Sequence, residues 1–183
     1  MRCCEKLRRL VSRKSTLVFI IVGISFFMLF YYRANPNALK IGEKAPDLAF
    51  ETMSGKKFRL YDIKEPVMLV FFNTNTFLSG GMYTHLYLRN MPYLKSIDKI
   101  NKAKLIIITD SGKQKDIIRE KLSDSRYKIL ENNVYSSNNK QAQTEYGLSI
   151  WPHFFLIDAN KQIIYTAKVP SVELVDGILD RSQ

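Results

Sequence analysis

Cysteine is nearly absent from this 183-residue chain. The two cysteines, Cys3 and Cys4, are adjacent near the N-terminus. A disulfide framework, a cysteine-based zinc site and an iron–sulfur cluster are therefore excluded from everything that follows them. Histidine is equally scarce, since the chain holds only His85 and His153. A multi-histidine metal centre is disfavoured for the same reason, and we expect neither a metal nor a cofactor.

Acidic residues are few relative to basic ones. The chain has 28 Lys and Arg against 17 Asp and Glu, which gives a formal net charge of +11. Much of this excess is concentrated at one end, because residues 1–14 carry six basic side chains against Glu5. A basic block beside an apolar run is typical of a segment that flanks a membrane, and we expect no nucleic-acid partner.

Charge is absent altogether from residues 15–32, which read STLVFIIVGISFFMLFYY. Eighteen helical residues span about 27 Å, close to the thickness of the hydrocarbon core of a bilayer. Lys14 and Arg33 bracket the run, and three aromatic residues at its end suit a membrane interface. The sequence therefore predicts a single-pass membrane anchor.

The basic flank sets the predicted orientation of this anchor. Because positive flanks stay inside, residues 1–14 are expected in the cytoplasm. Residues 33–40 are expected to form a linker, and residues 41–183 a domain on the extracytoplasmic side, in the periplasm or at the cell surface. A cleaved signal peptide is the alternative, although the apolar run is long and RANPNALK offers no small-residue cleavage site. The two cysteines are then cytoplasmic, either as inert thiols or as palmitoylation sites.

Hydrophobic periodicity after the linker predicts an alternation of strands and helices. Strands are expected at Leu48–Thr52, Lys57–Tyr61, Val67–Phe72, Lys104–Thr109, His153–Asp158 and Gln162–Ala167. Helices are expected at about Gly81–Ile100, Lys113–Ser123, with Ile117, Ile118 and Leu122 inward, Asn139–Tyr146, closed by Gly147, and Val172–Leu179. This order predicts an α/β domain with an N-terminal β-hairpin and a mixed sheet that carries helices on both faces.

Five short motifs carry a resemblance to a known family. They are residues 41–47 (IGEKAPD), 54–60 (SGKKFRL), 67–73 (VMLVFFN), 146–148 (YGL) and 151–158 (WPHFFLID). In this order and spacing the region resembles the thioredoxin-like superfamily, and in particular the membrane-anchored TlpA/ResA type of thiol–disulfide oxidoreductase among the AhpC/TSA redoxins. The resemblance covers nearly all of residues 41–183 and implies a thioredoxin-like fold.

The chain departs from this family at its reactive motif. The family carries W-C-x-x-C directly after the strand at Val67–Phe72, whereas this chain reads Thr76-Phe77-Leu78-Ser79. Asn90 stands where the family has an acid, and Ser79 is expected to cap the helix that follows. Disulfide exchange needs a thiolate, and a hydroxyl does not ionise comparably near neutral pH. We therefore expect no catalytic residue here and regard Thr76, Ser79 and Asn90 as degenerate positions.

The resemblance also implies where a partner would bind. Pro152 matches the family's cis-proline, beside which the family binds an extended peptide, and the residue before it normally faces the former active site. The candidate binding residues are Phe77, Trp151, Pro152 and His153, with Tyr83 and Tyr87 as further aromatic candidates. For each aromatic residue except Trp151, core packing is the competing interpretation.

Three hypotheses follow for the function. The first is a membrane-anchored, non-catalytic thioredoxin-like domain that binds a protein or peptide partner. The second is an oxidoreductase that works through cysteines of its partner. The third is a metal or anion carrier, in which His85 and His153 would be the available imidazoles.

Overall fold

The computed structural model describes residues 37–79, 82–109, 115–125, 127–137, 144–148 and 152–181, together with helical residues at 18, 20–23 and 25. The chain divides into two compact units, Met1–Pro36 and Asn37–Gln183. Within the described part of the chain, no helix combines the length and the apolar character needed to cross a membrane. The predicted basic segment at 1–14 and most of the predicted anchor at 15–32 lie outside the described residues.

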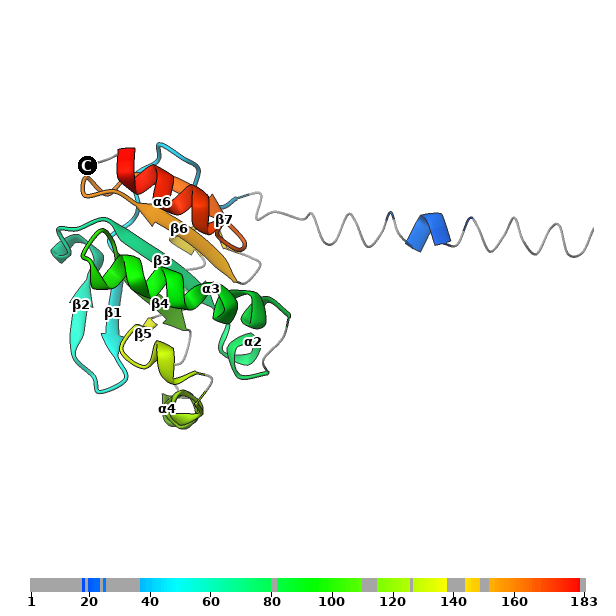
Figure 1. Cartoon of the computed structure of the whole chain (residues 1–183), viewed down its shortest axis with the longest axis horizontal. Coiled ribbons are helices and arrows are strands. Elements are labelled where there is room, and N and C mark those ends of the chain that lie inside the picture. The colour runs from blue at the N-terminus through cyan, green and yellow to red at the C-terminus, as the bar shows by residue number, and fades with distance from the viewer. Residues whose placement is uncertain are drawn as a thin grey trace, which may run out of the picture. The chain divides into compact units, whose positions relative to one another are not determined.

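The second unit is built on one seven-stranded mixed sheet with the order β2-β1-β5-β4-β3-β6-β7 (Figure 1). The strands are β1 (Ala49–Thr52), β2 (Lys57–Arg59), β3 (Val67–Phe72), β4 (Lys104–Thr109), β5 (Val134–Ser137), β6 (His153–Ile157) and β7 (Ile163–Ala167). The helices are α2 (Thr74–Ser79), α3 (Met82–Lys99), α4 (Lys115–Ser123) and α6 (Val172–Arg181), with short 3-10 turns η1 (Leu60–Asp62) and η2 (Lys128–Leu130).

Strand β3 is the centre of this sheet. All six of its residues are buried. It pairs in parallel with β4 over its whole length and antiparallel with β6, with Phe71 opposite His153. A strand covered on both faces reads as a continuous apolar run rather than an alternating one, which is why VMLVFF predicts it well.

Two hydrophobic clusters cover the two faces of the sheet. On one face the apolar sides of α3, α4 and α6 pack together with Phe77 of α2. Figure 1 shows α3 and α6 lying across this face. On the other face the cluster is closed by η1, by the opening segment around Ala45 and Leu48, and by Tyr146 and Leu148. Most of the helix predicted at Asn139–Tyr146 lies outside the described residues, but Thr144 and Glu145 are helical.

The structure corrects the element predictions in three places. Residues Thr74–Ser79, where no helix is predicted, form the separate helix α2. The strand β5 was not expected, although it fills the gap between β1 and β4. Ile117 was expected to face inward on α4, but it is half exposed, whereas Ile118 and Leu122 are buried. Neighbouring helical residues lie about 100° apart, and the buried pair has the i, i+4 spacing of one face.

Gly147 packs closely against the segment at Asn37–Leu39, which opens the second unit. Its backbone has a φ of +63°, in the left-handed region where side chains are unfavourable. A Cβ at this position would overlap the carbonyl oxygen of Asn37. Next to it, the amide of Leu39 donates to the carbonyl oxygen of Tyr146 at 3.3 Å. Residue 147 therefore needs glycine for its conformation and for its space.

We expect Gly147→Ala to lower the free energy of unfolding by more than the roughly 1–2 kcal/mol that a left-handed backbone costs an L-residue, because the overlap with Asn37 adds to it. The measurement is urea unfolding of the full-length protein, followed by the fluorescence of its single tryptophan.

Two other glycines serve as matched controls. Gly55 has a φ of +92° with open space around its Cβ position, so Gly55→Ala should cost the conformational part alone. Gly177 lies inside α6 in open space, and Gly177→Ala should stabilise by roughly 0.5–1 kcal/mol. Equal losses in Gly147→Ala and Gly55→Ala would contradict the contact with Asn37.

Candidate functional site

The segment that replaces the family's reactive motif is helical and starts directly after β3. The amide of Asn75 donates to Oδ1 of Asn73 at 2.9 Å, and the amide of Phe77 donates to the carbonyl oxygen of Asn73 at 2.9 Å. Asn73 is thus the N-cap of α2, a role that its short amide side chain suits. The cap places Thr76 in the first turn of the helix. Ser79 is exposed and is the last residue of α2. The sequence predicts it instead as the cap of the following helix.

Strand pairing brings Pro152 to the same end of the sheet. Phe71, near the end of β3, lies opposite His153, the first residue of β6. Pro152 is buried and immediately precedes β6, so its backbone lies beside the junction of β3 and α2. The start of α2 and Pro152 therefore lie at the same end of the sheet. Trp151 lies outside the described residues, and so do the side chains of Thr76 and Tyr83.

Two aromatic candidates belong to the core rather than to a surface. Phe77 has no exposed surface, and its ring packs at 5.7 Å from Phe72 and 5.4 Å from Tyr127 between ring centroids. Tyr87 is also buried, and its hydroxyl donates to the carbonyl oxygen of Lys168 at 2.6 Å. Contact of either ring with a partner would require the core to open, so the structure favours core packing for both.

Asn90 joins α3 to the loop before α6. Its Nδ2 donates to the carbonyl oxygen of Pro170 at 3.3 Å. Tyr87, three residues earlier on the same helix, makes a second bond to the same loop, at Lys168. The position where the family has an acid thus holds a neutral side chain whose described bond is structural.

His153 is a buried, neutral imidazole at this end of the sheet. It is only 6% exposed, and its Nε2 lies 2.8 Å from Oγ1 of Thr166. The ring also packs on Phe155, with centroids 4.7 Å apart. Burial, and secondarily the positive charge of Lys168, lower the pKa of His153 to about 4. At neutral pH it therefore supplies a hydrogen-bonding group without charge.

The two histidines do not form a metal site in the described structure. His85 is exposed on α3, whereas His153 is buried on β6. Across the part of the chain that the structure describes, no group of three or more His, Cys, Asp or Glu side chains is placed to hold a metal ion.

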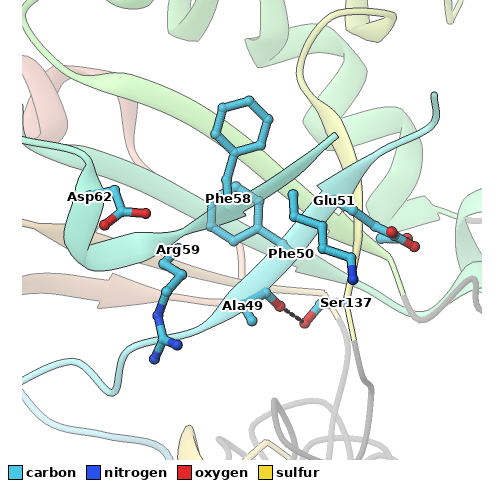
Figure 2. Close-up of a pocket in the computed structure, with 9 residues that line it drawn as sticks. Ala49, Phe50, Glu51, Phe58, Arg59, Asp62 and Ser137 are labelled. Carbon is cyan, nitrogen blue, oxygen red and sulfur yellow. Dashed lines mark hydrogen bonds between the residues drawn. The ribbon is translucent and has the colours of Figure 1, made fainter. Parts of the chain in front are cut away.

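Sequence reasoning missed the hollows at the β1–β2 side of the sheet. One of about 570 Å³ is lined by β1, β2, Asp62 and the end of β5 (Figure 2). Figure 2 shows the rings of Phe50 and Phe58 on one side of these strands and Arg59 on the other. Arg59 is paired with Asp47 at 2.6 Å, and Oγ of Ser137 donates to the carbonyl oxygen of Ala49 at 2.7 Å. Only the alternation of Lys57, Phe58 and Arg59 signals such a surface in the sequence.

The burial of His153 predicts a pH-dependent stability. The pKa rises from about 4 in the folded state to the ordinary value near 6.5 on unfolding, so the unfolded chain binds the proton first as the pH falls. The contribution of neutral His153 to the free energy of unfolding is fully present above pH 6.5. It is lost progressively as the pH falls from 6.5 to 4. At about 1.4 kcal/mol per pKa unit, the loss reaches at most about 3.5 kcal/mol.

We expect His153→Gln to abolish this part of the pH dependence, measured as the urea-unfolding free energy at several pH values. His85→Gln is the control, because that ring is exposed, and it should retain the full loss. Carboxylates titrate equally in both variants, so the difference between them isolates His153. Parallel pH profiles for the two variants would show that His153 is not the group responsible.

Comparisons with known proteins agree with this geometry. Residues 41–166 match the AhpC/TSA family. No curated protein sequence matches significantly. A domain of a possible thiol-disulfide isomerase from Cytophaga hutchinsonii has a TM-score of 0.60 at 20% identity, covering 79% of this chain and 93% of that one.

Two further solved structures are similar over most of their length. The thioredoxin domain of a thiol-disulfide oxidoreductase from Bacteroides vulgatus has a TM-score of 0.57 at 16% identity and covers 80% of this chain and 100% of its own. The pneumococcal exposed lipoprotein thioredoxin from Streptococcus pneumoniae has a TM-score of 0.56 at 18% identity, with 74% and 99% covered. These likenesses show a thioredoxin-like fold, and with the match over residues 41–166 the chain belongs to the AhpC/TSA family.

Proposed function

We propose that Asn37–Gln183 is a non-catalytic redoxin domain that binds a protein or peptide partner at the α2 end of its sheet. One observation carries this proposal. The frame of the family's reactive site is present, with α2 capped directly after β3 and Pro152 beside it, yet no cysteine exists beyond Cys4. A domain without a cysteine thiol cannot form the mixed disulfide on which exchange depends.

A domain of this fold can still bind a peptide without its cysteines. Backbone recognition of an extended peptide depends on main-chain groups and on pocket shape rather than on a thiol. The residues that would position such a surface are held in place, because Asn73 caps α2, Phe77 packs in the core and Pro152 is buried. The proposal therefore assigns the surface around Ser79 and Pro152 to a partner.

We further propose that residues 15–32 anchor this domain to a membrane and that the domain lies on the extracytoplasmic side. The support is the sequence alone: an uncharged run of 18 residues behind a strongly basic segment. An oxidoreductase that uses its partner's cysteines is the second candidate for the same surface.

The redox part of the proposal predicts no activity in the natural domain and some in a repaired one. In a Cys3→Ser, Cys4→Ser background, the full-length protein should not reduce insulin with dithiothreitol above the uncatalysed rate. Adding Thr76→Cys and Ser79→Cys should create weak activity. The first cysteine then lies in the first turn of α2, where the helix dipole lowers a thiol pKa below its ordinary value near 8.5.

The matched control is Asn75→Cys with Leu78→Cys, which has the same spacing one position earlier on the same helix. It should show less activity, because its first cysteine is displaced around the helix from the position that the family uses. Activity without any cysteine would refute the non-catalytic assignment. Equal activity of the two pairs would refute the placement of Thr76 and Ser79.

Binding and orientation are tested together by a membrane-impermeant maleimide crosslinker in intact spheroplasts. Single cysteines are introduced at Ser79, on the proposed surface, and at the exposed Glu120 of α4 as the control. Both should react with the reagent if the domain is extracytoplasmic. Only Ser79→Cys should yield a discrete crosslinked species.

Three results are informative. Failure of both cysteines to react, with reaction after lysis, would overturn the orientation. Reaction of both without a crosslink specific to Ser79 would overturn the partner surface. A Ser79 crosslink that disappears when the partner's own cysteines are blocked would favour the second candidate.

A further inference from the structure

A second hollow lies far from α2, at the opposite end of the parallel strands. It has a volume of about 440 Å³ and reaches Ala103 and Lys104, at the start of β4, whereas α2 follows the end of β3. Because β3 and β4 run in parallel, these are opposite ends of the sheet. Its volume falls in the range of small-molecule sites, roughly 300–1,000 Å³.

Three aromatic rings line this hollow and contact one another. Phe50 and Phe58 are stacked, with centroids 6.1 Å apart. Tyr135 meets Phe50 edge-on at 5.2 Å and Phe58 at 6.1 Å. Each ring presents a negative face or a positive edge, and the faces of such rings attract cations.

Phe58 makes a cation–π contact with a lysine of this chain. The ammonium of Lys56 lies 5.0 Å from the centroid of its ring. Lys56 is exposed and does not line the hollow. This contact shows that the aromatic cluster attracts an ammonium group in this structure.

The rim of the hollow is acidic, although the chain as a whole is strongly basic. Asp62, Glu65 and Asp98 line it, against Lys104 as the basic lining residue. Lys104 is paired with Asp98 at 3.5 Å. Asp62 and Glu65 are exposed and form no ion pair with any residue that the structure describes. Glu65 interacts electrostatically with Lys161, which is not a lining residue, and the lining itself stays net negative, with three carboxylates and Lys104.

Tyr135 adds a hydroxyl group to the residues that line the hollow. The residue is only 8% exposed, and its hydroxyl has no hydrogen-bond partner among the described residues. Burial, and secondarily the charge of Asp98, raise the pKa of Tyr135, so the hydroxyl stays protonated. Its oxygen keeps its lone pairs available to accept a bond.

We propose that this hollow, formed by Phe50, Phe58 and Tyr135 under the rim of Asp62 and Glu65, binds an organic cation: a primary ammonium group carried on an apolar or aromatic body. The body packs on the rings, the charge is attracted by the ring faces and the two carboxylates, and the ammonium donates a hydrogen bond to the Tyr135 oxygen. The site is separate from the partner surface proposed at α2 and does not rest on it.

The test is isothermal titration of the full-length protein with three probes of similar size and different charge. Phenethylammonium is the cation, 2-phenylethanol is neutral and phenylacetate is the anion, each corrected by a titration into protein-free buffer. We expect the order cation, neutral, anion, with the cation bound at least about tenfold more tightly than the anion, because both electrostatic contributions change sign.

Variants assign the binding to the hollow. Asp62→Asn with Glu65→Gln should weaken the affinity for phenethylammonium by about fivefold, since each solvent-exposed charge contributes only modestly. Glu120→Gln with Glu131→Gln is the matched control, because it makes the same change in net charge at exposed positions outside the hollow. This control should leave the affinity unchanged within about twofold.

Tyr135→Phe separates the hydrogen bond from the ring. It should weaken phenethylammonium by about fivefold, in line with one hydrogen bond, yet leave benzyltrimethylammonium unchanged, because a quaternary ammonium has no N–H to donate. No binding by the natural protein, equal affinity for the three probes, or equal losses in the rim and control variants would each overturn the proposal.

Discussion

The complete burial of β3 is the constraint on which the rest of the structure depends. Its six apolar residues need a neighbour on each edge and a layer on each face. The edge toward β4 is paired in parallel, so the chain must cross back over the sheet, and α3 makes that crossing. The edge toward β6 is paired antiparallel, so β6 must begin where β3 ends. The placement of α2 and Pro152 at the same end of the sheet is thus a consequence of burying β3.

This origin explains why the position of α2 does not depend on a reactive side chain. The contacts that fix α2 come from Asn73, which caps it, and from Phe77, whose ring packs between Phe72 and Tyr127. Phe77 lies between the two positions that carry sulfur in the family. The core contacts of Phe77 thus lie between the aligned positions Thr76 and Ser79, which carry no redox chemistry under the proposed function.

Sequence alone predicts the parts of this fold that have a strong local signal. The runs VMLVFF and KLIIIT give β3 and β4 with the boundaries observed, and the turn around Gly55 gives the first hairpin. Strand β5 was missed because half of VYSS is serine. Ser136 is nevertheless buried, through a sheet neighbour that is distant in the chain.

The candidate sites depend still more on long-range placement. The identity of the degenerate positions follows from aligned motifs, but the burial of Phe77 and His153 does not, since a single aromatic or imidazole has no periodicity to reveal which way it faces. The aromatic hollow has a weaker signal again. Phe50, Phe58 and Tyr135 come from three strands, and their rings meet only because β1 pairs with both β2 and β5. The net charge of +11 also gives no indication that two acidic residues, Asp62 and Glu65, lie together at the rim of the hollow.

The two ends of the sheet are separated by its buried central strands, β3 and β4. Energetic coupling between distant sites requires an element with two arrangements that both sites bias. The path from Ile106 at the hollow to Phe72 at α2 runs through β3 and β4, whose residues interdigitate with both hydrophobic clusters. Close-packed interiors of this kind do not deform continuously. A ligand in the aromatic hollow and a partner at α2 therefore have no described element through which one would alter the other, and each surface is best understood by its own chemistry.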